Sequence, residues 1–257
     1  MHRSHLRRLT GFLFIAGALL INVPYMLLIS SFDYPDILRQ PAEHILTQFA
    51  AGGTSLIAQW FAFAWVGLPL LLAMLLLPKA LGLEASAAMT TATMAGVVAA
   101  IAQMVGLLRW VFVVPVLSRL FADPAAGEAT RQAVVVAFRV VHQFGGVLLG
   151  EHVGQLFTIL WMGLVSLARL RSSVVKAWLG WLGIVASAIY LAAQTELLAT
   201  VVPAFPAVPQ AGLVGSLLWL GWMLVLGITL AARSADMSPS PTTAAGVSGH
   251  SARTRGI

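Results

Sequence analysis

The stretch HQFGGVLLGEHVGQLFTILW, residues 142–161, places polar side chains at the head of an apolar segment that continues to residue 170. A helix rises about 1.5 Å per residue, so about 20 apolar residues cross the hydrocarbon core of a membrane. Residues 146–170 meet this length and predict a membrane-spanning helix. Polar groups are expensive inside lipid and usually face a protein interior or a hydrated cavity. The surroundings of His142, Glu151, His152 and Gln155 are therefore the central question for function.

Five further apolar segments of similar length accompany this one. Only 9% of the 257 residues are charged and 59% are hydrophobic, whereas soluble domains carry about 25% charged residues. The lipid bilayer is thus the expected partner of most of the surface. We predict an all-α fold, a polytopic membrane helix bundle of about six transmembrane helices with short interfacial helices on the outer side. The other five segments lie near residues 10–30, 54–77, 87–111, 174–200 and 212–232.

Composition excludes several classes of protein. The chain has no cysteine, which excludes disulfides, thiolate metal ligands and cysteine nucleophiles. The net charge of +6 fits basic cytoplasmic loops. Because no soluble segment combines a basic patch with aromatic residues, we expect no nucleic-acid binding. The first apolar segment exceeds the roughly 7–15 apolar residues of a signal peptide, so we expect an uncleaved first helix, kinked near Pro24.

The distribution of basic residues predicts the orientation. With the N-terminus inside, ten of the 15 Lys and Arg residues fall in inner segments and five fall on the outer side. This asymmetry favours a plasma-membrane protein with both termini in the cytoplasm. Residues 1–233 form the predicted bundle, and residues 234–257 predict a disordered cytoplasmic tail, because they are rich in Ser, Thr, Pro, Ala and Gly. The inner basic residues are Arg3, Arg7, Arg8, Lys79, Arg169, Arg171, Lys176, Arg233, Arg253 and Arg255.

Two outer segments predict short helices. Pro41 precedes apolar residues at helical spacing, and this pattern ends at Gly52–Gly53. Residues 128–144 have an apolar and a polar face, typical of an amphipathic helix that lies on, or leads into, the fourth span. Most tryptophans fit an aromatic belt at the membrane interface, where we expect Trp60, Trp110, Trp178, Trp181 and Trp219.

Polar residues at membrane depth gather in the outer halves of the predicted helices. A charge at this depth costs at least about 2.5 kcal/mol on insertion scales. We therefore expect one cavity that opens to the outside, with His142 at its rim and nearby glycines that allow a close helix approach. The expected lining residues are Gln103, Arg109, Glu151, His152, Gln155 and Glu196.

The same residues admit simpler interpretations. Glu151 and Glu196 would form structural ion pairs with Arg109 and Arg139, and His152 would donate to a carbonyl on a neighbouring helix. A metal or haem site would use His142, His152 and Glu151, since imidazole and carboxylate are suitable ligands. Carboxylates close to histidine also suit general acid–base chemistry. The sequence contains no HExxH motif, nucleophile elbow or phosphate-binding loop to favour a particular reaction.

The chain resembles a family of uncharacterised bacterial six-helix membrane proteins, grouped as a domain of unknown function. The resemblance rests on FDYPDILR at residues 32–39, LRWVF at 108–112 and the pattern H-x(8)-EH-x-G at 142–154. It covers about residues 8–232 and implies an inner-membrane location but no activity. By position it also singles out Pro35 and Trp110, and it adds Asp33, Asp36 and Arg39 to the candidate pocket residues.

Three functions remain open at this point. The first is a membrane protein that binds or transports a small ligand in an outward-facing polar pocket. The second is a membrane enzyme or metal-binding protein that uses Glu151, His152 and His142. The third is a structural or assembly subunit of a membrane complex. The sequence lacks the paired broken helices in two matching halves that mark inverted-repeat transporters, which favours binding over translocation.

Overall fold

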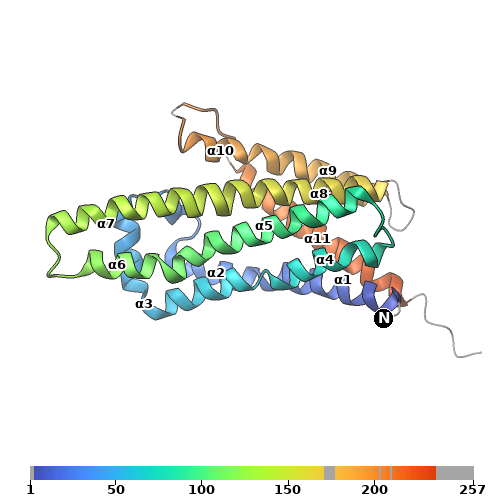
Figure 1. Ribbon diagram of the computed structural model, residues 1–257, viewed down its shortest axis with the longest axis horizontal. Coiled ribbons are helices and arrows are strands. Elements are labelled where there is room, and N and C mark those ends of the chain that lie inside the picture. Colours follow the sequence, from blue (N-terminus) through green and yellow to red (C-terminus); the bar gives the residue numbers. More distant parts are fainter. Residues whose placement is uncertain (1–2, 171–176, 203, 209, 236–257) are drawn as a thin grey trace, which may run out of the picture.

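The structure, a computed structural model, describes residues 3–170, 177–202, 204–208 and 210–235. All secondary structure in these ranges is helical, and the long helices lie side by side along one axis (Figure 1). The predicted all-α bundle is therefore confirmed. The predicted tail from residue 236 onward lies outside the described residues. Of the ten basic residues predicted to be cytoplasmic, Arg171, Lys176, Arg253 and Arg255 also lie outside them, and the side chains of Arg169 and Arg233 are not described.

Six helical segments of the described residues are long and apolar enough to cross a membrane. Each contains or overlaps one predicted segment, so the prediction of about six spans is confirmed. Several are longer than the about 20 residues that a bilayer requires. The six segments are Arg3–Phe32, Ala42–Leu81, Ala87–Ala122, Glu128–Ala168, Ala177–Ala199 and Ala211–Ala232.

The first span consists of α1 (Arg3–Leu20) and α2 (Asn22–Phe32), which meet at Ile21. This interruption lies three residues before Pro24, whose ring conflicts with the carbonyl four residues earlier, and the predicted kink itself stays a prediction. The second span begins beyond the short 3₁₀ helix η1 (Asp36–Arg39) with α3 (Ala42–Trp65) and continues as α4 (Leu68–Leu81).

Gly53 divides α3 into two parts. Its φ of 56° and ψ of −149° are not helical, and L-residues rarely adopt them. The first part of α3 is the predicted short outer helix, and it ends at the predicted glycine pair. The corner at Gly53 lets this part cross the bundle before the chain enters the membrane (Figure 1).

The third and fourth spans form a long hairpin. The third consists of α5 (Ala87–Phe112) and α6 (Val114–Ala122). The fourth consists of α7 (Glu128–Val141), η2 (His142–Val153) and α8 (Gly154–Leu170), joined without a turn. The predicted amphipathic helix is α7 and leads directly into the fourth span, whereas α6 was not predicted. Together α6 and α7 extend beyond the other helices at the end of the bundle opposite the N-terminus, which is called the outer end after its predicted side (Figure 1).

The last two spans cover the other side of the bundle. They are α9 (Ala177–Ala192), followed after a turn by the short α10 (Gln194–Ala199), and α11 (Ala211–Ala235). The predicted fifth span thus divides at Ala193. α10 lies outside the main bundle, beside the long fourth helix (Figure 1).

Two clusters of buried apolar residues form the core. One holds Phe14, Trp161 and Trp222, and the other, nearer the outer end, holds Trp60 and Trp110 among its aromatic residues. The rings of Trp60 and Trp110 stack with centroids 4.8 Å apart. Their predicted place in an interfacial belt is therefore wrong, because both are fully buried, and so is that of Trp219. Trp178 and Trp181 are exposed.

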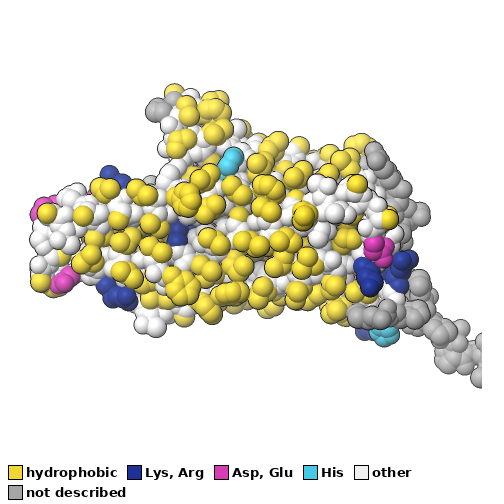
Figure 2. All heavy atoms as spheres, in the orientation of Figure 1, with side chains coloured by type: hydrophobic (Ala, Val, Ile, Leu, Met, Phe, Trp, Pro, Cys, Tyr) yellow, Lys and Arg dark blue, Asp and Glu magenta, His cyan; other side chains and the backbone are white. Residues whose placement is uncertain are grey.

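Hydrophobic side chains cover most of the visible face of the molecule, while charged side chains gather mainly towards its two ends (Figure 2). In a bilayer such a surface meets hydrocarbon along its length and water or headgroups at its ends. The chain is therefore an integral, multi-pass membrane protein.

Candidate functional site

The polar residues singled out in the sequence surround η2, a π-helical segment of the fourth span. The backbone N–H of Gly154 donates to the carbonyl of Leu149, five residues earlier, as π-helical geometry requires. Gly150 of η2 packs against Gly106 of α5 so closely that a Cβ on Gly106 would lie 2.6 Å from the Cα of Gly150. π-Helical geometry is rare and frequently found at functional sites, and η2, at 12 residues, packs closely against α5.

Arg109 lies where α5 and η2 meet and is only 8% exposed. Its Nη1 donates to the carbonyl of Gly106, and its guanidinium stacks over the ring of Trp110 at 5.0 Å. A Cβ on Gly146 would come within 2.6 Å of its Nη2. Among the described residues its Nε has no hydrogen-bond partner. Because glycine has no side chain, these positions leave room for a buried guanidinium.

Arg39 joins three elements of the outer end. Its Nη2 donates to Oε2 of Glu151 in η2 at 2.7 Å and lies 3.8 Å from Oε1 of Glu196 in α10. Burial disfavours the charge on Arg39, but its contact with Glu151 and the nearby Glu196 raise the pKa of the guanidinium above its ordinary value. The two predicted carboxylates are therefore held by Arg39 from the FDYPDILR segment.

The predicted pairing of Glu151 and Glu196 with Arg109 and Arg139 is wrong in its basic partners. Arg139 instead forms an exposed ion pair with Glu43 at 3.5 Å. Arg109 makes no ion pair within 4.0 Å among the described residues, and Glu151 pairs with Arg39 instead. The reason is geometric, because the guanidinium of Arg109 is packed against the glycine backbone of η2.

His142 connects the same outer segment to the start of η2. Its Nε2 lies 3.0 Å from the carbonyl oxygen of Leu38 and must donate to it, because a carbonyl only accepts. The imidazole stacks on the ring of Phe138 at 5.3 Å. Close by, burial and the Glu151 carboxylate raise the pKa of Tyr34 above its ordinary value, so the phenol stays protonated.

His152 belongs to a separate chain of hydrogen bonds. Its Nδ1 lies 2.7 Å from Oε1 of Gln194, and Nε2 of Gln194 donates to Oε1 of Gln155 at 3.0 Å. The expected bond from His152 to a carbonyl on a neighbouring helix is thus made to the side-chain amide carbonyl of Gln194 in α10. Deeper in the bundle, Gln103 donates to the hydroxyl of Thr158 at 2.9 Å.

The structure gathers most of the predicted site residues around η2 but not into a set of metal ligands. His142 and His152 face different partners, and no group of three or more His, Asp or Glu residues in the described ranges is placed to hold a metal ion. Asp33 ends α2 in a left-handed conformation, and Asp36 opens η1; both are exposed. The single cavity lined by all six predicted residues stays a prediction.

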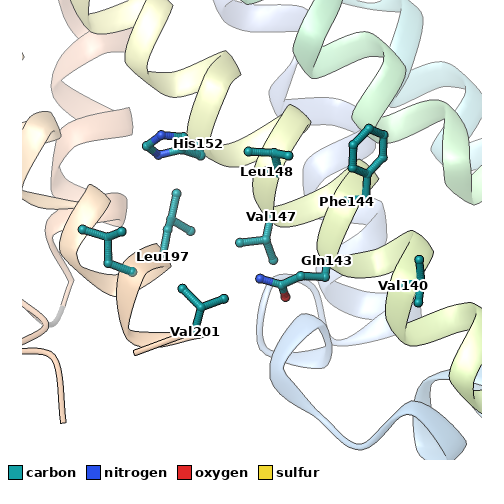
Figure 3. Close-up of a pocket in the computed structure, with 9 residues that line it drawn as sticks. Val140, Gln143, Phe144, Val147, Leu148, His152, Leu197 and Val201 are labelled. Carbon is teal, nitrogen blue, oxygen red and sulfur yellow. The ribbon is translucent and has the colours of Figure 1, made fainter. Parts of the chain in front are cut away.

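A groove of about 580 Å³ lies between η2 and α10. Its walls are apolar apart from Gln143 and His152, and His152 alone comes from the predicted pocket residues. Figure 3 shows side chains of α7 and η2 facing Leu197 and Val201 across the groove, with His152 at one end. The lining residues are Val140, Gln143, Phe144, Val147, Leu148, His152, Leu197, Leu198 and Val201.

Two hydrogen bonds join η2 to α10 and to the residue that follows it, one towards each end of the groove. At one end His152 pairs with Gln194, and at the other Nε2 of Gln143 donates to the hydroxyl of Thr200 at 3.2 Å. The apolar lining was missed by sequence reasoning, because Val and Leu in a groove look the same in sequence as Val and Leu that face lipid. The spacing of Val140, Phe144 and Leu148 at every fourth position marks one helix face but does not reveal what covers it.

Comparison with known proteins gives a family but no activity. The family described as Domain of unknown function (DUF4386) matches residues 9–227. No curated protein and no solved structure matches the chain.

Proposed function

Because the chain belongs to the family described as Domain of unknown function (DUF4386), whose description names no activity, we propose a function from the geometry: the protein binds a small, largely apolar ligand in the groove between η2 and α10. The groove itself carries this proposal. Ligand sites are typically concave, about 300–1,000 Å³ in volume, and lined by apolar side chains with a few polar groups that fix orientation. The groove has this size, this lining and two polar residues.

The position of the groove indicates how a ligand would enter. It is open along the side of the bundle, and two of its wall residues, Val140 and Val201, are 63% and 59% exposed. In the membrane this side faces hydrocarbon or the interface, so a lipophilic molecule would reach the groove from the bilayer. Entry from the lipid suits binding or capture better than passage along the bundle axis.

We place the groove in the outer leaflet of a bacterial plasma membrane, with both termini in the cytoplasm. Six crossings put both termini on one side, and Figure 1 draws the N-terminus and the end of α11 at the same end of the bundle. By sequence, ten of the 15 Lys and Arg residues belong to the segments predicted to be inner, and of these Arg3, Arg7, Arg8 and Lys79 lie at that end in the structure. Excess Lys and Arg favours the cytoplasmic side.

Photolabelling with a matched pair of variants tests the proposal. The probe is a long-chain alcohol that carries an alkyl diazirine, added to the protein in lipid nanodiscs. Leu148 lines the groove and is 43% exposed, and Leu160 is 44% exposed further along the same continuous helix but outside the groove. Leu148→Trp fills the groove with a bulky ring, whereas Leu160→Trp adds the same ring to a surface outside it.

The wild type and Leu160→Trp are expected to show saturable labelling mapped to Val147, Leu197 and Val201. Leu148→Trp is expected to lose most of this labelling while keeping its elution as a monodisperse protein. Labelling that does not saturate, or that is equal in both variants, would show that the groove takes no ligand.

A further inference from the structure

We infer that the ligand of this groove is an uncharged lipophile with a hydroxyl group, and that Nε2 of His152 accepts the hydroxyl proton in a hydrogen bond. This inference rests on the proposed function and specifies its ligand. It comes from the direction of the hydrogen bonds around His152 and from the absence of charge in the groove lining.

The orientation of His152 is set by two glutamine side chains. Because the amide nitrogen of Gln194 donates to Gln155, its amide oxygen faces the imidazole. An amide oxygen only accepts, so Nδ1 of His152 must carry the proton. In the neutral ring the proton on Nδ1 leaves a lone pair on Nε2, which is then an acceptor.

Nε2 of His152 has no hydrogen-bond partner among the described residues, and His152 lines the groove. The only other polar residue of the lining, Gln143, donates one of its two amide N–H groups to Thr200, which leaves its amide oxygen and one N–H. Both residues therefore present an acceptor, whereas only Gln143 has a donor to spare, so a ligand that donates a hydrogen bond complements both residues and one that only accepts complements Gln143 alone.

The charge of the surroundings indicates a neutral ligand. None of the lining residues carries a formal charge. Glu151 and Glu196 are neighbours in sequence of His152 and Leu197, but both are held by Arg39. A charged headgroup in this apolar groove would lose its hydration without a counter-ion, which is costly. A long-chain or polyprenyl alcohol, or a phenol with an apolar substituent, has the required chemistry.

A pair of competitors that differ in one hydrogen-bond donor tests the inference. Farnesol and farnesyl methyl ether share the same chain, but the ether cannot donate. Each is titrated against the diazirine probe on protein in nanodiscs. The measured quantity is the ratio of competitor to lipid at which the labelling of the groove is halved. For the wild type, farnesol is expected to compete about threefold to tenfold better, since a hydrogen bond contributes about 0.5–1.5 kcal/mol net.

Two variants identify the acceptor. In His152→Phe the ring keeps its apolar bulk but loses the acceptor, so both competitors are expected to displace the probe equally. In Gln143→Leu the preference for farnesol is expected to persist. A preference that survives in His152→Phe and disappears in Gln143→Leu would overturn the assignment of His152.

The outcomes separate this inference from the proposed function. If labelling by the probe does not saturate and neither competitor reduces it, the groove is not a ligand site and the proposed function fails. If both compete equally in the wild type, the groove binds lipophiles but the hydroxyl assignment is wrong. If the ether competes better, the hydroxyl proton finds no acceptor in the groove, and the assignment of Nε2 of His152 as that acceptor is wrong.

Discussion

Arg39 holds two carboxylates that come from different parts of the chain. It lies 112 residues before Glu151 and reaches both Glu151 in η2 and Glu196 in α10. The position of the two glutamates within their predicted spans was enough to place them at the outer end of the bundle, because a charge inside lipid is expensive. It did not identify Arg39 as their partner, since a contact over this distance depends on how the chain returns after the corner at Gly53.

A double-mutant cycle measures what this contact contributes. Because Glu151 is only 21% exposed at its side chain and Arg39 36%, we expect a coupling of about 1 kcal/mol in the free energy of unfolding in detergent between Arg39→Ala and Glu151→Ala. The exposed pair Arg139–Glu43 is the control, and its coupling is expected to be near zero. Equal coupling in the two pairs would mean that Arg39 is no more than a surface contact.

At the scale of elements, the close approach of α5 and η2 fixes the position of η2, which forms one wall of the groove. The glycines that permit it are visible in the sequence, as are the six apolar spans, because span length and apolar character follow directly from bilayer thickness. The π-helical geometry of η2 and the separate helix α6 were not predictable in this way. Their residues have the same apolar spacing as an ordinary helix, and tertiary packing decides the geometry.

Gly106→Ala tests this approach. The added Cβ would lie 2.6 Å from the Cα of Gly150 and 2.8 Å from the carbonyl oxygen of Gly145, and neither backbone atom can move without shifting η2. We expect a loss of about 1–3 kcal/mol in stability, seen as a lower midpoint of thermal unfolding.

Gly221→Ala is the matched control, because a Cβ there meets nothing within 4 Å. It is expected to leave the unfolding midpoint unchanged or to raise it, since Ala has the higher helix propensity. Similar losses in the two variants would show that glycine matters here only through backbone propensity and not through the contact of α5 with η2.

At the scale of the whole molecule, the proposed topology decides whether the groove faces the outer leaflet. Because the chain has no native cysteine, single cysteines report the side of the membrane without background. Asp123→Cys in the turn between α6 and α7 is expected to react with a membrane-impermeant maleimide on intact cells. Glu84→Cys, in the turn between α4 and α5 at the opposite end, is expected to react only after the cells are opened; the reverse pattern would invert the topology.

Native mass spectrometry of the protein released from nanodiscs tests most directly whether the groove holds a lipophile. The wild type and Leu160→Trp are predicted to carry a bound neutral lipophile at one copy per chain, and Leu148→Trp is predicted to lack it. The same adduct at the same occupancy in Leu148→Trp, or no adduct in the wild type, would contradict the central claim that the space between η2 and α10 is a ligand site.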